Sequence, residues 1–336
     1  MVFNTVFKIA AVLALTLISM DQAAAIPMAS KAQLTGDGVE QKDCDTKGVR
    51  SQSTLGMLGG LIQKATLHSA DGKDPLREQV RTGEGRFFAP IGVIKPNQKL
   101  DVLDAKGKPV KSKDVRGTTF LVSACYALTN AHAVVGLSKN PDAIKKKVSS
   151  TITFQAGNLK LEEKRATIAA LGNKAKSGFT SDDWALVHLP SCPGEKIGWM
   201  KMAGPILDRH FEQSQFMIAG FPGDRSEDML WAHKGCYANK PDPRNPGSWL
   251  SNCSSLGGMS GSPIMKITNG QPEVYGLLTS EVTGAKGVQT EWKADNSNVI
   301  SDLRNMKNTV HDAIAPDLAR VRENPAINPT IILGQK

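Results

Sequence analysis

The chain has 336 residues, of which 40% are hydrophobic and 22% charged, and its formal net charge is +9 at pH 7. This composition supports a substantial core and excludes a chain that is disordered throughout. Part of the positive charge lies in local runs such as Lys145-Lys146-Lys147. We interpret these runs as solvated loop charge, and we expect no nucleic-acid partner.

The first 25 residues have the pattern of a cleaved secretory signal. Lys8 precedes an apolar run from Ile9 to Met20, and Ala23-Ala24-Ala25 offers small residues where a signal peptidase would cut. A membrane anchor is the alternative, but the run is shorter than the roughly 20 residues that cross a bilayer. The sequence therefore predicts a secreted or periplasmic protein with no integral membrane segment after signal removal.

The cysteines fit an exported protein, because disulfides form in oxidising compartments and rarely in the cytosol. Their odd number leaves at least one unpaired; they are Cys44, Cys125, Cys192, Cys236 and Cys253. None has CxxC or CxxH spacing, and the six histidines are scattered singly along the chain. The sequence therefore predicts neither a metal ion nor any other cofactor.

The chain divides into regions that differ in amino-acid composition and in the pattern of apolar residues. Residues 26–86 are rich in Gly, Gln, Ser, Asp and Lys, which is typical of a pro-segment or flexible arm. From Phe87 onward, short apolar or β-branched runs alternate with turn residues, which predicts antiparallel β structure in two units, 87–200 and 201–295. The expected strands are 91–94, 118–122, 148–154, 184–189, 216–221, 229–235, 263–267 and 274–279.

Residues 296–336 are expected to form a C-terminal helix and a tail. Apolar side chains recur there at steps of four, three, four and four, which places them on one helical face. They are Val299, Leu303, Met306, Val310 and Ile314. We interpret this stripe as a core contact and not as a partner site.

Three short segments carry residue types suited to nucleophilic catalysis. His132 lies in 128–134, Asp183 begins 183–187, and Ser260 lies in 257–263. A serine hydroxyl needs an adjacent base to take its proton, and a histidine, whose usual pKa is about 6.5, suits that task. A buried carboxylate can hold the imidazole in one tautomer and stabilise its positive charge. His132 is the candidate base, Asp183 its orienting carboxylate and Ser260 the nucleophile.

Glycines flank the candidate nucleophile. They let backbone N–H groups turn inward toward the oxyanion that forms on the attacked carbonyl. Gly258 and Ser260 are the expected donors of this oxyanion hole.

Together these segments resemble the trypsin-like serine peptidases, and especially their bacterial branch that includes the glutamyl endopeptidases. The histidine, aspartate and serine occur in the family's chain order. The turn 220–224 and the strand 274–281 are also similar to family segments, so the resemblance covers roughly residues 87–295. It implies an all-β, chymotrypsin-like fold of two six-stranded antiparallel β-barrels with the substrate between them, followed here by the C-terminal helix.

Two alternatives for the site can be compared with the family pattern. Asp182 competes with Asp183, but Asp183 directly precedes Trp184 as the pattern requires. An α/β-hydrolase would need Gly-x-Ser-x-Gly, whereas Ser262 occupies the last glycine position. The other histidines are interpreted as surface or packing residues: His68, His188, His210, His233 and His311.

The sequence departs from the family at two places. Met259 stands where the animal enzymes have the aspartate that pairs with a new N-terminus, so any need to remove residues 26–86 would act differently, for example by unblocking the cleft. Leu278 stands where the glutamyl enzymes place a histidine, so a preference for glutamate is unsupported.

The resemblance also implies a specificity pocket and disulfide pairs. Ser254 is the expected pocket base, and its lack of charge argues against selection of Arg or Lys. The other substrate-binding candidates are Thr279, Ser280 and Glu281. The expected disulfides are Cys236–Cys253 and Cys125–Cys192, with Cys44 free in the arm.

We therefore expect an exported serine endopeptidase that acts on protein or peptide substrates through an acyl-enzyme. One rival is a catalytically silent relative that serves as a binding or adhesion module. Another is an esterase-like or highly selective processing enzyme. The sequence leaves the oligomeric state and the preferred cleavage residue open.

Overall fold

The structure is a computed structural model that describes residues 76–80, 85–96, 102–103, 109–110, 116–135, 148, 150–172, 181–204, 206–212, 214–223, 225, 229–280 and 297–324. The expected signal, Cys44, Glu281 and most of the expected arm lie outside the described residues. None of the helices in the described part is long and apolar enough to span a membrane.

The first β unit is a curled sheet of seven antiparallel strands in the order β8-β7-β2-β5-β6-β10-β9. Its strands are β2 (Ile91–Pro96), β5 (Gly117–Leu121), β6 (Tyr126–Thr129), β7 (Ser150–Ala156), β8 (Leu159–Glu163), β9 (Thr167–Leu171) and β10 (Ala185–His188). Within the described residues, β8 and β9 end the sheet without pairing with each other. We expected a barrel of six strands here. The sheet has seven strands because the hairpin of β7 and β8 adds β8 at its edge.

The second β unit contains a closed barrel of six strands, because β14 at one end of the series β13-β12-β15-β16-β17-β14 pairs again with β13. These strands are β12 (Gln215–Gly220), β13 (Trp231–Pro241), β14 (Ser248–Ser251), β15 (Pro263–Thr268), β16 (Gln271–Ser280) and β17 (Asn298–Asp302). β11 (Lys201–Met202) and β1 (Glu78–Gln79) extend this sheet at β16 and β13. The predicted all-β class is confirmed.

The remaining elements are short, apart from the C-terminal helix. The structure also contains β3 (Val102–Leu103), β4 (Pro109–Val110), α2 (Gly85–Phe88), α3 (Ala131–Val135), α4 (Gly194–Ile197), α5 (Asp208–Glu212), the 3₁₀ turn η5 (Leu303–Asn305) and α6 (Lys307–Glu323).

Strand β5 is buried on both faces and lies between two apolar cores. Its alternate side chains point to opposite faces, as in any β-strand. Phe120 belongs to the core that fills the second barrel, whereas Leu121 belongs to the core of the first sheet. The core that fills the second barrel also includes Leu128 and Trp184 from the first unit, so this apolar core is continuous across the two units.

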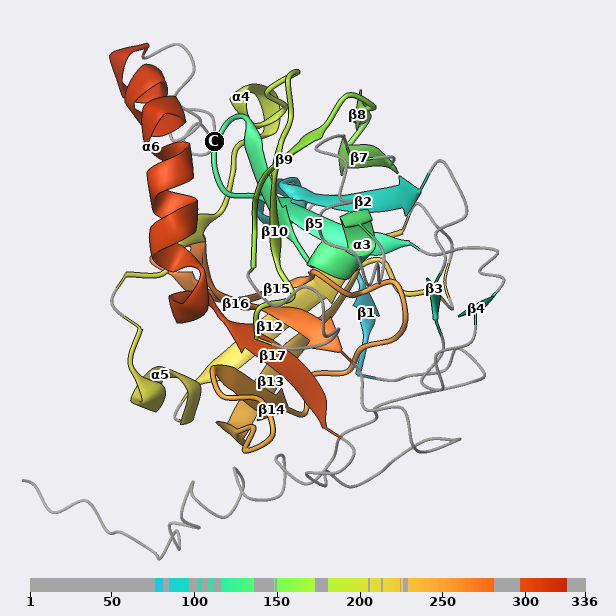
Figure 1. Ribbon diagram of the computed structural model, residues 1–336, viewed down its shortest axis with the longest axis vertical. Coiled ribbons are helices and arrows are strands. Elements are labelled where there is room, and N and C mark those ends of the chain that lie inside the picture. Colours follow the sequence, from blue (N-terminus) through green and yellow to red (C-terminus); the bar gives the residue numbers. More distant parts are fainter. Residues whose placement is uncertain are drawn as a thin grey trace, which may run out of the picture. The chain divides into compact units, whose positions relative to one another are not determined.

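Helix α6 connects the second barrel to the first sheet. Its apolar residues Val310 and Ile314 pack in the core of the second barrel. Farther along, Val321 packs against Ala124 and Cys125 in the turn between β5 and β6. In Figure 1, α6 runs alongside both units, from the end of β17 to the neighbourhood of α4. The helix therefore packs against the turn that precedes β6, and β6 in turn leads into α3.

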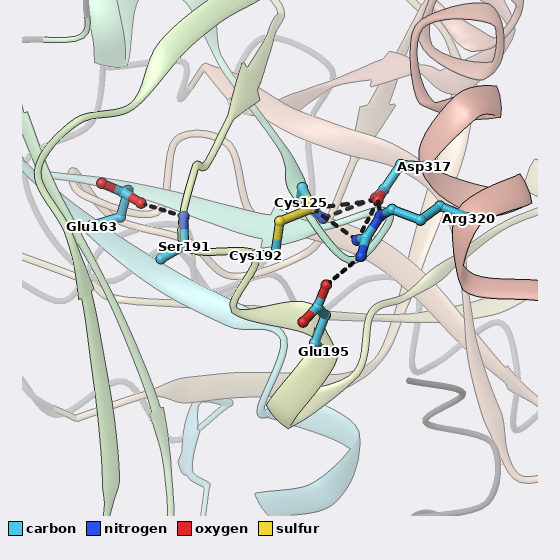
Figure 2. Close-up of a disulfide and its surroundings, with 7 residues drawn as sticks. All are labelled: Cys125, Glu163, Ser191, Cys192, Glu195, Asp317 and Arg320. Carbon is cyan, nitrogen blue, oxygen red and sulfur yellow. Dashed lines mark hydrogen bonds and ion pairs between the residues drawn. A yellow bond between two sulfur atoms is a disulfide. The ribbon is translucent and has the colours of Figure 1, made fainter. Parts of the chain in front are cut away.

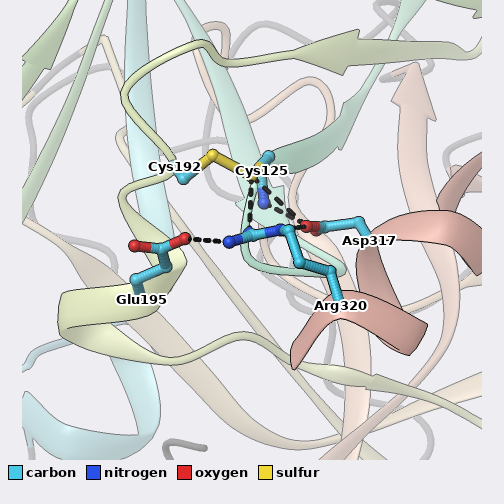
Figure 3. Close-up of polar contacts among 5 residues, drawn as sticks. All are labelled: Cys125, Cys192, Glu195, Asp317 and Arg320. Carbon is cyan, nitrogen blue, oxygen red and sulfur yellow. Dashed lines mark hydrogen bonds and ion pairs between the residues drawn. A yellow bond between two sulfur atoms is a disulfide. The ribbon is translucent and has the colours of Figure 1, made fainter. Parts of the chain in front are cut away.

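A disulfide and a set of charges reinforce this end of α6. Cys125 and Cys192 are bonded, as expected, and so are Cys236 and Cys253. Asp317 Oδ2 accepts a hydrogen bond from the backbone N–H of Cys125 at 2.9 Å. Arg320 forms ion pairs with Asp317 at 2.8 Å and with Glu195 on α4 at 2.6 Å (Figure 3).

The backbone beside this disulfide is held as well. Glu163, at the end of β8, accepts a hydrogen bond from the N–H of Ser191 at 3.0 Å, next to Cys192 (Figure 2). The segment before α4 is thus attached both to the first sheet and to α6.

Two boundaries differ from those expected. β1 lies inside the expected arm yet pairs with β13, and the N–H of Val80 donates to Leu230 O at 3.0 Å. β17 lies after the expected end of the second unit at 295 and includes Val299, which we placed on the helix. Both strands form because they pair with distant segments of the chain. The short-range periodicity of the sequence does not predict such pairing.

We expect the substitution Asp317→Ala to lower the free energy of unfolding by about 2 kcal/mol. It leaves the buried N–H of Cys125 without its acceptor and removes one carboxylate from Arg320. Urea unfolding at equilibrium, with the disulfides intact, measures this change.

Glu162→Ala is the matched control, because Glu162 forms an ion pair with Lys160 at 3.1 Å on the exposed surface. Exposed pairs contribute little, so we expect a change below about 0.5 kcal/mol. Equal losses in the two variants would show that the α6 contacts are no stronger than ordinary surface pairs.

Candidate active site

His132 and Asp183 form a closely coupled pair. The ring Nδ1 of His132 lies 2.6 Å from Asp183 Oδ2, and the backbone N–H of His132 donates to Oδ1 at 3.0 Å. The side chain of Asp183 is 1% exposed and that of His132 is 15% exposed. Both carboxylate oxygens are therefore engaged by one residue, which fixes the position and the plane of the imidazole.

Neighbouring strands place this pair. β6 runs directly into α3, which carries His132, and Asp183 directly precedes β10. β6 and β10 pair antiparallel, with Ala185 opposite Thr129. In addition, the side-chain amide of Asn130 donates to the backbone oxygen of Asp183 at 2.7 Å. The expected proximity of the histidine and the aspartate follows from this register.

The environment raises the pKa of His132 above its usual value of 6.5. Burial of the ring acts in the opposite direction and is the largest single effect, because it disfavours the charged imidazolium. The negative charge of Asp183 and its hydrogen bond to the ring together outweigh burial. The pair therefore stabilises a positive charge on His132, as a base that accepts a proton requires.

The segment 256–262, which we call the Ser260 loop, is anchored by a buried apolar side chain and by a backbone hydrogen bond. Met259 is fully buried in the core of the second barrel. The carbonyl oxygen of Ser260 accepts a hydrogen bond from the N–H of Thr118 on β5 at 2.8 Å. Ser260 itself is half-buried.

Glycine is required on both sides of the contact between this loop and the histidine turn. Gly261 has φ +86°, and a Cβ there would lie 2.5 Å from Thr129 Oγ1 and 3.2 Å from Asn130 N. A Cβ on Gly117 would lie 2.9 Å from the Cβ of Ala133 and 3.6 Å from Ser260 O. The structure therefore brings the Ser260 segment against the turn that carries His132.

The two expected oxyanion donors have no protein acceptor among the described residues. The carbonyl of Gly257 accepts from Gly223 N–H at 2.6 Å, and the carbonyl of Met259 accepts from Ser262 N–H at 2.9 Å. In a trans peptide the N–H points away from the preceding carbonyl. The N–H groups of Gly258 and Ser260 are therefore directed away from those partners.

The candidate specificity residues occupy different environments. Ser254 is fully buried, and its N–H donates to Nδ1 of His233 at 2.7 Å. Thr279 is also buried and shares a hydrogen bond with Ser301, whereas Ser280 is half-buried at the end of β16. The structure thus buries Ser254 and Thr279 and leaves Ser280 partly exposed.

His233 makes a contact that the sequence does not predict. We classed this histidine as a surface or packing residue, and it is buried on β13 with Nδ1 accepting from Ser254. A single histidine in a strand gives no signal of such a contact, because its partner is 21 residues away.

Among the residues that the structure describes, one group has the ligand types of a metal site: Cys125, Cys192 and Glu195. The two sulfurs are bonded to each other, so neither is available as a thiolate ligand. This group does not fit a metal ion while the disulfide is intact.

Comparisons with known proteins give structural similarity only. Neither a family model nor a curated protein matches this sequence. A solved structure described as Glu endopeptidase in complex with MPD is similar, with 14% identity and a TM-score of 0.47, over 69% of this chain and 95% of that one. The protease Anisep from Arthrobacter nicotinovorans also aligns, with 14% identity and a TM-score of 0.45, over 68% of this chain and 96% of that one. Similarity at this level assigns no function to this chain.

Proposed function

We propose that this protein is an exported serine endopeptidase in which Ser260, His132 and Asp183 form the catalytic triad. The pair of His132 and Asp183 is the main support for this proposal. Both carboxylate oxygens of Asp183 contact His132, and the pKa of His132 is raised. A triad also needs a nucleophile, and Ser260 supplies it from a loop that packs against the turn carrying His132. The two disulfides agree with export.

The reaction proceeds through an acyl-enzyme. His132 Nε2 removes the proton of Ser260 Oγ while that oxygen attacks the substrate carbonyl, and Asp183 stabilises the resulting imidazolium. The N–H groups of Gly258 and Ser260 stabilise the oxyanion. His132 then gives the proton to the leaving amine as the peptide bond breaks, and water releases the acyl group in the same way.

Digestion of a mixed peptide library tests this proposal. We expect the full chain to cleave peptides, with products identified by mass spectrometry, and His132→Ala to cleave none. Turnover of activated esters without peptide cleavage would support an esterase-like enzyme instead. Absence of any turnover would favour a protein that only binds, and would overturn the proposal.

The activity is expected to rise with pH through a midpoint above 6.5, because only neutral His132 can accept the serine proton and its pKa is raised. The profile of kcat/KM against pH reports this ionisation in the free enzyme. A midpoint at or below the usual histidine value would contradict the coupling between His132 and Asp183.

A further inference from the structure

Thr118 connects the first sheet to the Ser260 loop through both its backbone and its side chain. Its hydroxyl donates to the carbonyl oxygen of Gly258 at 3.0 Å and accepts from the N–H of Phe221 at 3.1 Å. Its backbone N–H donates to Ser260 O at 2.8 Å. We propose that Thr118 is a positioning residue that fixes the oxyanion donors of the proposed serine peptidase.

The hydroxyl of Thr118 holds the carbonyl side of the peptide that lies between the two donors, whereas the N–H of that peptide, from Met259, donates to Leu256 O within the loop. The carbonyl of Gly257 is already held by Gly223, and that of Ser260 is held by the backbone of Thr118. The carbonyl of Gly258 has the Thr118 hydroxyl as its partner. These three carbonyls of the loop are therefore held from outside it, and Thr118 holds two of them.

The loop needs this support because of its glycines. Gly258 has φ +100°, a conformation that side chains rarely adopt, and it follows another glycine, Gly257, which is exposed. Glycine gains the most conformational freedom when its contacts are lost. Without the hydroxyl, the carbonyl of Gly258 loses its partner, and the peptide that joins Gly258 to Met259 can tilt about the flexible Gly258. The N–H groups of Gly258 and Ser260 lie on either side of this peptide, so they then lose their fixed spacing.

The neighbouring threonine provides a natural comparison. Thr119 is equally buried, and its hydroxyl donates to Leu128 O at 3.0 Å within the first sheet. Because side chains alternate along a strand, Thr118 shares the face of Phe120 toward the second barrel, whereas Thr119 shares the face of Leu121. The two residues differ in which loop their hydroxyls hold.

The test compares Thr118→Val with Thr119→Val, which remove one buried hydroxyl each. Thr118→Val is expected to lower kcat for a peptide substrate by about 10²-fold with KM changed less than about threefold, because the oxyanion forms only after binding. Thr119→Val keeps kcat within about threefold, and Thr118→Ser recovers most of the loss. An equal fall in kcat for both valine variants, or no rescue by serine, would overturn the proposal.

A second readout does not depend on activity. Hydrogen exchange of a peptide covering residues 256–262 is expected to accelerate in Thr118→Val and to stay unchanged in Thr119→Val, since Met259 and Ser262 donate within this loop. Unchanged exchange in Thr118→Val overturns the positioning role, whatever the activity. Accelerated exchange in a protein whose unsubstituted form has no peptidase activity refutes the proposed function instead, and with it the catalytic use of this loop.

Discussion

Replacement of Ser260 by alanine is expected to lower kcat for peptide substrates by about 10⁶-fold. The variant lacks the oxygen that forms the acyl-enzyme, while its backbone carbonyl still accepts from Thr118 N–H. The fold is therefore expected to survive, with an unchanged unfolding midpoint. Rates from a peptide substrate and a thermal unfolding curve on the same preparation measure both quantities.

Ser248→Ala is the matched control for this variant. Ser248 is buried on β14, and its hydroxyl has no hydrogen-bond partner among the described residues. Because its loss removes only a buried hydroxyl outside the site, kcat should stay within about twofold. Comparable losses in the two variants would mean that Ser260 is not the nucleophile.

The variant Asp183→Asn is expected to lower kcat by about 10⁴-fold through the wrong tautomer of His132. The backbone N–H of His132 can only donate, so the oxygen of the asparagine must stay opposite it. The amide NH₂ then faces Nδ1, which must accept, and the ring proton moves to Nε2. That nitrogen can no longer take the proton of Ser260.

The same substitution also changes the pH dependence. Without the charge of Asp183, burial remains as the main influence and lowers the pKa of His132, so the residual activity should begin at lower pH. Asp182→Asn is the control, because Asp182 is half-buried beside Asp183 and competes with it in the sequence. A larger loss in Asp182→Asn than in Asp183→Asn would show that the carboxylate was assigned wrongly.

The sequence predicted the features that depend on local pattern. Alternating apolar runs located strands such as β5 and β12, and the short segments around His132 and Asp183 were recognised by their residue types and order. The resemblance supplied both disulfide pairs, which the structure confirms. The strands and the short site segments are encoded by a few neighbouring residues, so they can be recognised one segment at a time. The disulfides join residues that are 67 and 17 positions apart, so their pairing came from the resemblance.

The features that were missed depend on contacts between distant segments. β1 consists of Glu78 and Gln79, two polar residues that form a strand only because they pair with β13. The part played by Thr118 is likewise invisible in the sequence, since its hydroxyl meets Gly258, 140 residues further along. Such residues look like ordinary strand or turn positions until the two units are packed together.

The proposed function depends on Ser260 being a nucleophile that His132 activates. Reaction with a fluorophosphonate, followed by mass spectrometry of the modified peptide, tests it in the full chain and in a chain that begins at Leu76 and keeps β1. We predict modification at Ser260 that disappears in His132→Ala. Modification of another serine, or no modification of either chain, would show that Ser260 is not an activated nucleophile.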